Sequence, residues 1–259
     1  MESRLTASEE KDTFQHKPLK EEIFDVLHKR IIAGKYPPGE WLRQEIISSQ
    51  LGVSQTPVRE ALDLLVSAGL AERVPYRGVR VLQLTTEEIV DAYAVRLVLE
   101  SAAVRAAAIN RTEAQKRMLA DIVEQTKALV TLADMSTQRQ LNREFHRTLV
   151  AASGNSLLTR LYEMASNQFP DWMLYEYMFR HPELLPSSLA KEYQEHKAIA
   201  EAVADGDAGL SVKHAIEHIR NLGNELVSYL GIPKTLLVKT EEQLKPLLTD
   251  SSQTRTSST

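Results

Sequence analysis

The segment from Thr85 to Leu230 constrains the fold most strongly, because apolar side chains recur there at helical spacing and no strand pattern interrupts them. Thr85 and Glu88 have the spacing of a capping box, which predicts the start of a long helix that ends near Ile109. Further helices are predicted over residues 112–133, 137–152, 155–177, 187–204 and 207–230. This pattern predicts an all-α bundle of six to seven helices.

The preceding segment is organised differently, as three short helices followed by a hairpin. The predicted helices run from Pro18 to near Ile32, from Gln44 to Leu51, and from the N-cap Ser54 to the stop at Gly69. Two β-like runs, 71–74 and 79–82, then flank a tip that contains Pro and Gly. Two short helices joined by a Gly-containing turn form a helix-turn-helix, and the hairpin would make it winged.

The fold is therefore predicted to be mainly α, with a winged helix-turn-helix domain over residues 18–84 and an all-α domain over 85–231. Residues 1–17 and 232–259 are predicted to be a disordered N-terminus and a C-terminal tail. The chain has no cysteine, which excludes disulfides, thiolate zinc fingers and cysteine nucleophiles. It has no signal-peptide pattern and no run of roughly 18 apolar residues. We expect a cytoplasmic protein without membrane contact.

The net charge of −4 does not by itself indicate nucleic-acid binding. Between residues 26 and 80, however, eight Lys and Arg stand against five Asp and Glu. Gln55 and Arg59 are spaced i, i+4 beside Thr56, so they share a helix face that could enter a major groove. Arg77 and Gly78 at the hairpin tip suit a narrow minor groove. A solvated helix face and an ordinary turn would explain the same residues.

Three histidines lie on three different predicted helices: His146, His196 and His218. Histidines on facing helices can converge on a metal such as zinc or nickel in a bundle core, or can be buried and hydrogen-bonded without a metal. His214 and His218 also form the H-x-x-E-H spacing of a zinc peptidase, with Glu217 as the base. His16, His28 and His181 are predicted to lie in disordered or solvated surroundings and are given no role.

Arg96 lies in a strongly apolar predicted helix, with Glu100 one turn later. The two could form a simple ion pair, or Arg96 could clamp a carboxylate in a bundle cavity. The aromatic residues Trp172, Tyr175 and Tyr177 could line that cavity, form a dimer surface or belong to the core. Asn167 is a weaker polar candidate.

Long stretches of the sequence resemble one family. "IIAGKYPPGEWL", "LGVSQTPVREALDLLVSAGL" and "YRGVRV" closely resemble the winged helix-turn-helix of GntR-family bacterial transcription regulators. "AVRLVLES", "NREFHRTLVAASGN" and "EHKAIAEAVADGD" look like the FCD effector domain of the FadR-type subfamily. The resemblance implies that Ser54, Gln55, Thr56, Arg59, Arg77 and Gly78 contact DNA. Position 55 is usually Arg in the family, so Gln55 implies an altered operator preference.

The resemblance also implies a metal site and an effector site. FCD domains typically hold a metal on one Asp and three His, and the matching positions here are Asn142, His146, His196 and His218. Asn142 brings no negative charge, so weaker binding is expected, with zinc first and nickel or manganese behind. Arg96 matches the Arg that lines the effector cavity, and Asn167 and Tyr175 are the other effector-binding candidates.

The function that follows from the resemblance is a homodimeric bacterial transcription regulator, not an enzyme. We expect a repressor whose binding to double-stranded operator DNA is modulated by a small carboxylate effector, although FadR-type proteins can also activate. Two alternatives stay open. One is an all-α metal-dependent hydrolase that uses the H-x-x-E-H stretch, and the other is a DNA-binding protein whose pocket no longer takes a ligand.

Overall fold

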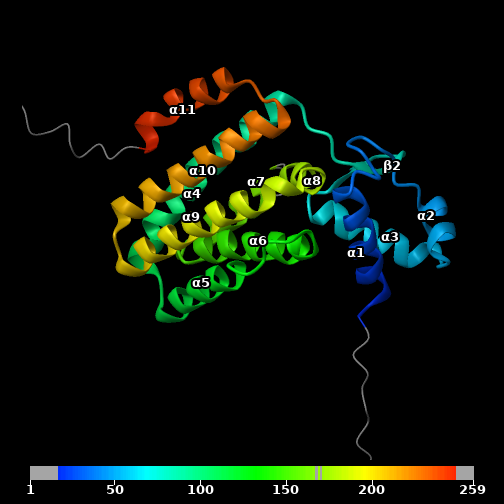
Figure 1. Ribbon diagram of the computed structural model, residues 1–259, viewed down its shortest axis with the longest axis horizontal. Helices are drawn as coiled ribbons and strands as arrows, with labels where there is room; N and C mark the ends of the chain where they lie inside the picture. The colour runs from blue at the N-terminus through cyan, green and yellow to red at the C-terminus, as the bar shows by residue number, and fades with distance from the viewer. Residues whose placement is uncertain (1–16, 167–168, 170, 249–259) are drawn as a thin grey trace, which may run out of the picture.

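The computed structural model describes residues 17–166, 169 and 171–248, which form a small winged unit at one end of a helical bundle (Figure 1). The N-terminal unit contains α1 (Leu19–Ile32), α2 (Gln44–Leu51), α3 (Gln55–Ser67), β1 (Ala71–Val74) and β2 (Gly78–Val81). The bundle contains α4 (Thr86–Asn110), α5 (Glu113–Thr126), η1 (Leu132–Asp134), α6 (Met135–Ala151), α7 (Ser156–Ser166), α8 (Asp171–Arg180), η2 (Pro182–Leu184), α9 (Leu185–Asp205), α10 (Ala208–Leu230) and α11 (Lys234–Leu248).

The winged unit has the predicted order of elements, and local chemistry explains its boundaries. α2 ends at Gly52 and α3 is followed by Gly69, and both glycines have the positive φ that closes a helix (67° and 68°). β1 and β2 pair antiparallel, from Ala71 opposite Val81 to Val74 opposite Gly78. The helix-turn-helix and its hairpin wing are therefore confirmed.

The bundle is built around α4, the long helix that the capping box of Thr85 and Glu88 starts. Figure 1 shows α4 lying along α10, with α9, α6 and α7 around it. α4 is surrounded by other helices, which explains why its sequence is apolar on more than one face. Among the described residues no helix is long and apolar enough to cross a membrane.

Three predicted boundaries differ from the structure. The helix predicted over 112–133 ends at Thr126, because Thr131 and Asp134 form a new capping box that starts η1. The helix predicted over 155–177 is two helices, α7 and α8, and the sequence between them contains Pro170, which cannot donate to a helix ladder.

The third difference is at the C-terminus, where part of the predicted tail is the helix α11. Its Leu237 and Leu248 are buried in one cluster with Tyr93 and Leu97 of α4. Glu241 of α11 accepts hydrogen bonds of 2.7 Å from the Tyr93 hydroxyl and from Nε of Arg220. In Figure 1 α11 lies beside α10 on the outer side of the bundle, and it packs on α4 as an integral layer.

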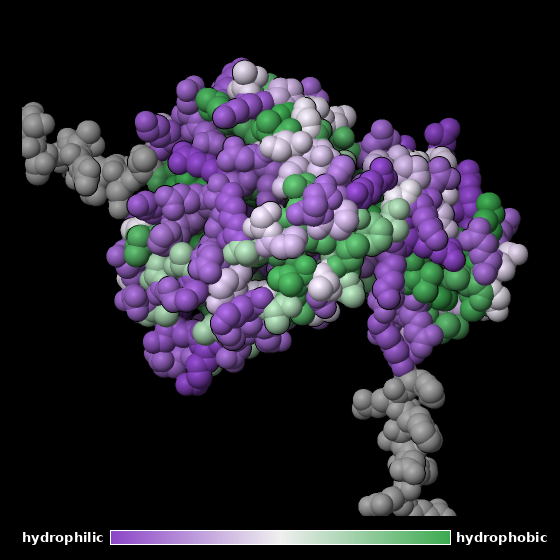
Figure 2. Space-filling model, in the orientation of Figure 1, coloured by the Kyte–Doolittle hydropathy of each residue, from purple (hydrophilic) through white to green (hydrophobic). Residues whose placement is uncertain are grey.

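The two units share a hydrophobic core. Met135 of α6 and Trp172, Tyr175 and Met178 of α8 belong to the same buried cluster as the apolar side chains of α1, α3 and the wing. On the face seen in Figure 2, the surface is mostly hydrophilic, with apolar side chains gathered mid-bundle and on the winged unit. The winged unit is therefore packed onto α6 and α8, so a change in those helices can reach it.

Candidate functional site

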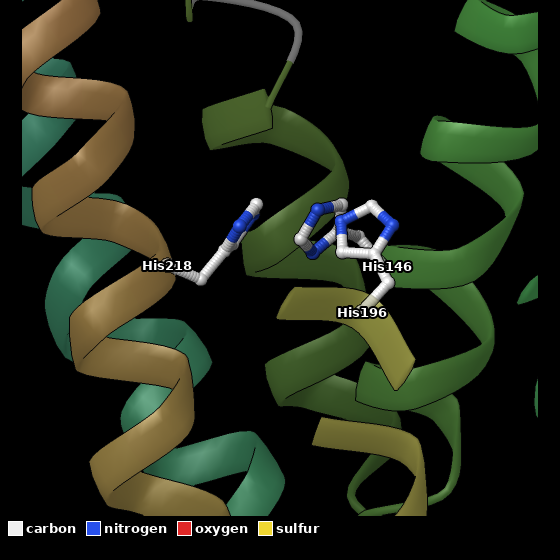
Figure 3. Close-up of side chains that lie close together, drawn as sticks. All are labelled: His146, His196 and His218. Atoms are coloured by element: carbon white, nitrogen blue, oxygen red, sulfur yellow. The ribbon is translucent and has the colours of Figure 1, made fainter. Parts of the chain in front are cut away.

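The structure brings together the three histidines that the sequence placed on separate helices. His146 comes from α6, His196 from α9 and His218 from α10, and their side chains point toward one another (Figure 3). One ring nitrogen of each lies within 4.8 Å of the corresponding nitrogens of the other two. All three residues are buried, with relative exposures of 5% or less. In the described part of the chain this cluster has the geometry of a metal site.

Carboxylates lie against two of the imidazoles. Nδ1 of His218 donates a 2.7 Å hydrogen bond to Oε2 of Glu195, and Nδ1 of His146 lies 2.9 Å from Oε2 of Glu100 without hydrogen-bond geometry. A carboxylate on one ring nitrogen fixes the tautomer and leaves the other nitrogen as the donor toward a metal. Neither contact could be predicted from the sequence, because Glu100 and Glu195 lie on different helices from His146 and His218.

The cluster also passes a chemical test for a metal site. Burial lowers the pKa of His146 to about 4 and that of His196 well below its ordinary value, so both rings are neutral near pH 7. Neutral imidazole is the form that binds zinc and nickel. Oδ1 of Asn142 and Nε2 of His196 are buried and have no hydrogen-bond partner. Such unsatisfied groups are costly, and coordination of a cation would satisfy them.

Arg96 is buried beside the cluster. It forms an ion pair with Glu100, and its Nη2 donates to Nε2 of His146 over 2.9 Å. Burial opposes the charge on Glu100, but Arg96 and His146 hold the pKa of this carboxyl below its usual range. The predicted ion pair is therefore present, and the same guanidinium faces the metal-binding nitrogen of His146. A metal at this nitrogen and Arg96 would compete for one lone pair.

A small pocket of about 50 Å³ opens next to the histidines. Its lining includes Arg96, Asn142, Tyr175, Glu192, Glu195, His218 and Glu225. Burial raises the pKa of Glu192 to about 7. Tyr175 is among the lining residues, whereas Tyr177 stacks on Tyr229 with ring centroids 4.7 Å apart and does not line this pocket. Asn167 lies outside the described residues.

The peptidase alternative does not fit this geometry. The cluster uses His218 without His214, whose side chain is 27% exposed and lies 3.5 Å from that of Glu217. Glu217 is itself half exposed. The H-x-x-E-H stretch therefore does not supply two histidines to one metal site in this structure.

The helix α6 joins the histidine cluster to the winged unit. It carries Asn142 and His146 at the cluster, while Nη1 of Arg143 donates to the carbonyl oxygen of Ala68, directly after α3, over 3.2 Å. Nη1 of Arg139 donates to Nε2 of His28 on α1 over 3.0 Å. A groove of about 970 Å³ runs along this contact.

The expectation that His28 is solvated is wrong. It is only 7% exposed, and burial together with Arg139 lowers its pKa to about 4. Nε of Arg139 also lies 3.4 Å from Oδ2 of Asp171 at the start of α8. No signal in the sequence identifies this cluster, because its three residues come from α1, α6 and α8.

The residues predicted to contact DNA lie on one exposed edge of the winged unit. Ser54, Gln55, Thr56 and Arg59 are exposed at the N-terminal end of α3, and the first turn of α3 has no acidic residue. Nε2 of Gln44 donates to the side-chain oxygen of Gln55 over 3.3 Å, so α2 holds this side chain. Arg77 and Gly78 are exposed at the wing tip. Within the described residues no side chain pairs with Arg59 or Arg77.

A winged helix-turn-helix packed on a helical domain with a small pocket is the architecture of a DNA-binding transcription regulator. Residues 19–81 match the family model for "Bacterial regulatory proteins, gntR family", and residues 91–221 match the FCD domain. The chain belongs to the GntR family and carries an FCD domain. It is a DNA-binding transcription regulator and not an enzyme, so the hydrolase alternative is wrong.

Relatives and solved structures agree with this assignment. The chain is 30% identical, over 76% of its length and 83% of the relative, to a probable D-xylose utilization operon transcriptional repressor of Paenarthrobacter nicotinovorans. It is 24% identical, over 83% of its length and 88% of the relative, to the gluconate operon transcriptional repressor of Bacillus subtilis. The fold is similar to that of E. coli McbR/YncC, with a TM-score of 0.60 and 22% identity over 83% of this chain and all of that one.

Proposed function

We propose that the protein is a homodimeric repressor that leaves its operator when a small organic acid binds beside the histidine cluster. One observation carries this proposal: α6 holds Asn142 and His146 at the cluster and, through Arg139 and Arg143, contacts the winged unit. One relative is named as a probable repressor of a D-xylose utilization operon and another as the repressor of a gluconate operon, which supports a sugar-derived acid as the effector class. Such a regulator works in the bacterial cytoplasm, where the chromosome lies.

For operator recognition, we assign the N-terminal end of α3 to the major groove and the wing tip to the minor groove. Arg59 would bond guanine or phosphate, Ser54 and Thr56 would donate to phosphates, and Arg77 with Gly78 would enter the minor groove. Gln55 stands where the family usually has Arg, so it would change the preferred base. Gln55→Arg should shift the half-site that is selected from random duplexes, and an unchanged half-site would refute this role.

For the effector, we assign zinc, before nickel or manganese, to His146, His196, His218 and Asn142. The bound metal would supply a positive centre that coordinates a carboxylate. Arg96 would donate to a second oxygen of the same acid, and Tyr175 would pack on it from α8. Since Arg96 donates to His146 in the structure, it has to leave that nitrogen before His146 can act as a ligand. Asn167, outside the described residues, stays a sequence-based candidate.

For assembly, an apolar stripe on α7 supports a dimer. Leu157, Leu161 and Met164 are spaced i, i+4, i+7 and are 56%, 44% and 69% exposed. α7 packs on α4, which also carries the exposed Val95 and Ile109. A stripe of exposed apolar side chains such as that on α7 marks protein interfaces, and a second copy of the chain is the occupant that operator palindromes require.

The response is a population shift between two placements of the winged units. Two half-sites lie about 34–36 Å apart per helical turn, so a small rotation of one unit weakens binding to both. The acid must bind the two placements with different affinity to shift them. Movement of α6 would act directly on the Ala68 carbonyl after α3 and on His28 of α1.

The test begins with operator fragments selected from genomic DNA, followed by fluorescence polarisation in the presence of zinc and a panel of sugar acids. One acid should raise the operator Kd and be recovered chemically unchanged. Arg143→Ala should keep acid binding but reduce its effect on the operator Kd. Arg147→Ala, on an exposed turn of the same helix and paired with Glu163, is the matched control. An acid that binds beside the cluster and leaves the operator Kd unchanged would contradict the proposal.

A further inference from the structure

We propose that Tyr76, at the tip of the wing, is a DNA-contacting residue that sets operator affinity. It lies in the four-residue turn from Val74 to Arg77, which is closed by a 3.0 Å hydrogen bond from the Arg77 amide to the Val74 carbonyl. Pro75 stands at the second position of this turn and Tyr76 at the third, with φ of 62°. This is the pattern of a type II turn, whose third position strongly favours glycine.

The conformation of Tyr76 is unfavourable for the fold. Tyr76 is the one non-glycine residue with positive φ in the described part of the chain. In the left-handed backbone region, any residue with a Cβ atom is about tenfold less populated than glycine, and bulky residues are less populated still. Residues held in such conformations occur preferentially at functional sites.

Packing within the chain does not compensate for this cost. The relative exposure of Tyr76 is 109%, so its ring is fully in solvent. An aromatic ring normally contributes by burying its faces and by giving its hydroxyl a partner. Tyr76 does neither within this molecule, which indicates that its partner lies outside the chain.

The position of Tyr76 identifies that partner as DNA. Its neighbours Arg77 and Gly78 are the predicted minor-groove residues, and no described side chain pairs with Arg77. A flat phenol ring fits between the walls of a groove about 6 Å wide, and the hydroxyl can donate to the minor-groove acceptors of any A·T pair. The wing tip would thus present the Tyr76 hydroxyl as a hydrogen-bond donor, held on a rigid ring beside the positive charge of Arg77. This inference rests on the DNA binding of the family and does not depend on the effector.

The test compares Tyr76→Gly, Tyr76→Phe and Arg77→Ala with the parent protein, on a selected operator duplex and on an unrelated duplex of equal length. Fluorescence polarisation over a series of salt concentrations gives Kd and its salt dependence. Thermal unfolding of free protein gives the effect on the fold. Tyr177→Phe, on α8 of the other domain, is the matched control for loss of a phenol hydroxyl.

We expect Tyr76→Gly to weaken operator binding about tenfold, the scale of one aromatic contact to a nucleic acid. The same variant should unfold at a higher temperature, because glycine relieves the positive φ. Tyr76→Phe should weaken binding about threefold without a change in salt dependence, whereas Arg77→Ala should lower the salt slope by about 1. A larger loss on the operator than on the unrelated duplex places the hydroxyl at base edges, and an equal loss places it at the backbone.

Two outcomes would overturn the inference. Operator binding by Tyr76→Gly that equals parent binding would show that the ring does not touch DNA. Unfolding of Tyr76→Gly below the parent temperature would show that Tyr76 stabilises the wing and is kept for the fold.

Discussion

Mild acid should loosen the contact between the two domains through His28. This side chain is 7% exposed, accepts a hydrogen bond from Arg139, and has a pKa of about 4 against 6.5 for an ordinary histidine. Between pH 4 and 6.5 the unfolded chain therefore binds more protons than the folded chain. Stability contributed by neutral His28 is complete above pH 6.5 and is lost as the pH falls.

The size of the effect follows from the two pKa values. Below pH 4 this shift in pKa lowers the free energy of unfolding by about 3 kcal/mol, and at pH 5 the loss is already about 2 kcal/mol. At pH 7 the loss is close to zero. For a chain of this length the free energy of unfolding falls by about 3 kcal/mol per M of urea. The urea concentration at the midpoint of unfolding should therefore fall by about 0.7 M between pH 7 and pH 5 because of His28.

The assay is urea unfolding at pH 5, 6 and 7 in chelating buffer, for the parent and for His28→Gln. Glutamine can still accept from Arg139 but does not titrate, so the variant should lose about 0.7 M less than the parent. Other buried histidines titrate in both proteins and cancel in this difference. His181→Gln, with 44% of the side chain exposed, is the control and should follow the parent. Equal losses for His28→Gln and the parent would refute the reasoning.

Three further predictions concern the cluster and the assembly. Asn142→Asp adds the missing negative charge and should lower the zinc Kd at least about tenfold, since even residues that only hydrogen-bond to metal ligands change metal affinity on this scale. Competition with a fluorescent chelator measures the zinc Kd, and an unchanged value would remove Asn142 from the ligand set. Glu100→Gln leaves Arg96 buried without its carboxylate and should cost about 3–5 kcal/mol in urea unfolding at pH 7, whereas a cost below 1 kcal/mol would mean that the pair is not closed in solution. Leu161→Glu should convert a dimer to a monomer in sedimentation velocity, and a variant that stays dimeric would exclude the α7 stripe as the interface.

Local signals explain why so much of the winged unit was predictable. Its helix ends are set by Gly52 and Gly69, and the capping box at Thr85 starts α4. These effects act within one or two turns of the chain and do not depend on distant residues. The end of α5 was missed for a related reason: the apolar pattern continues through Leu129 and Leu132, while the capping box at Thr131 restarts the chain.

The helix α11 was missed because its stability is not local. Its sequence, from Lys234 to Leu248, contains Pro246, and the polar run 239–243 interrupts its aliphatic residues. It is helical where Leu237 and Leu248 can pack on α4 and where Glu241 can accept from Tyr93 and Arg220. Most helical stability in proteins comes from such packing and not from propensity.

The sequence by itself determined the order of the elements in the winged unit, the long helix α4, the residues of α3 proposed to contact DNA, and the three histidines as candidate ligands. These features follow from periodicity, caps, turn residues and family motifs, which are all written in neighbouring positions. Only the tertiary structure decided that Glu100 lies against His146, that Glu195 orients His218, that Arg96 donates to His146, and that His28 is buried against Arg139. Each of these pairs joins two different helices and residues 23 to 111 positions apart in the chain, so the packing of the helices had to bring them together.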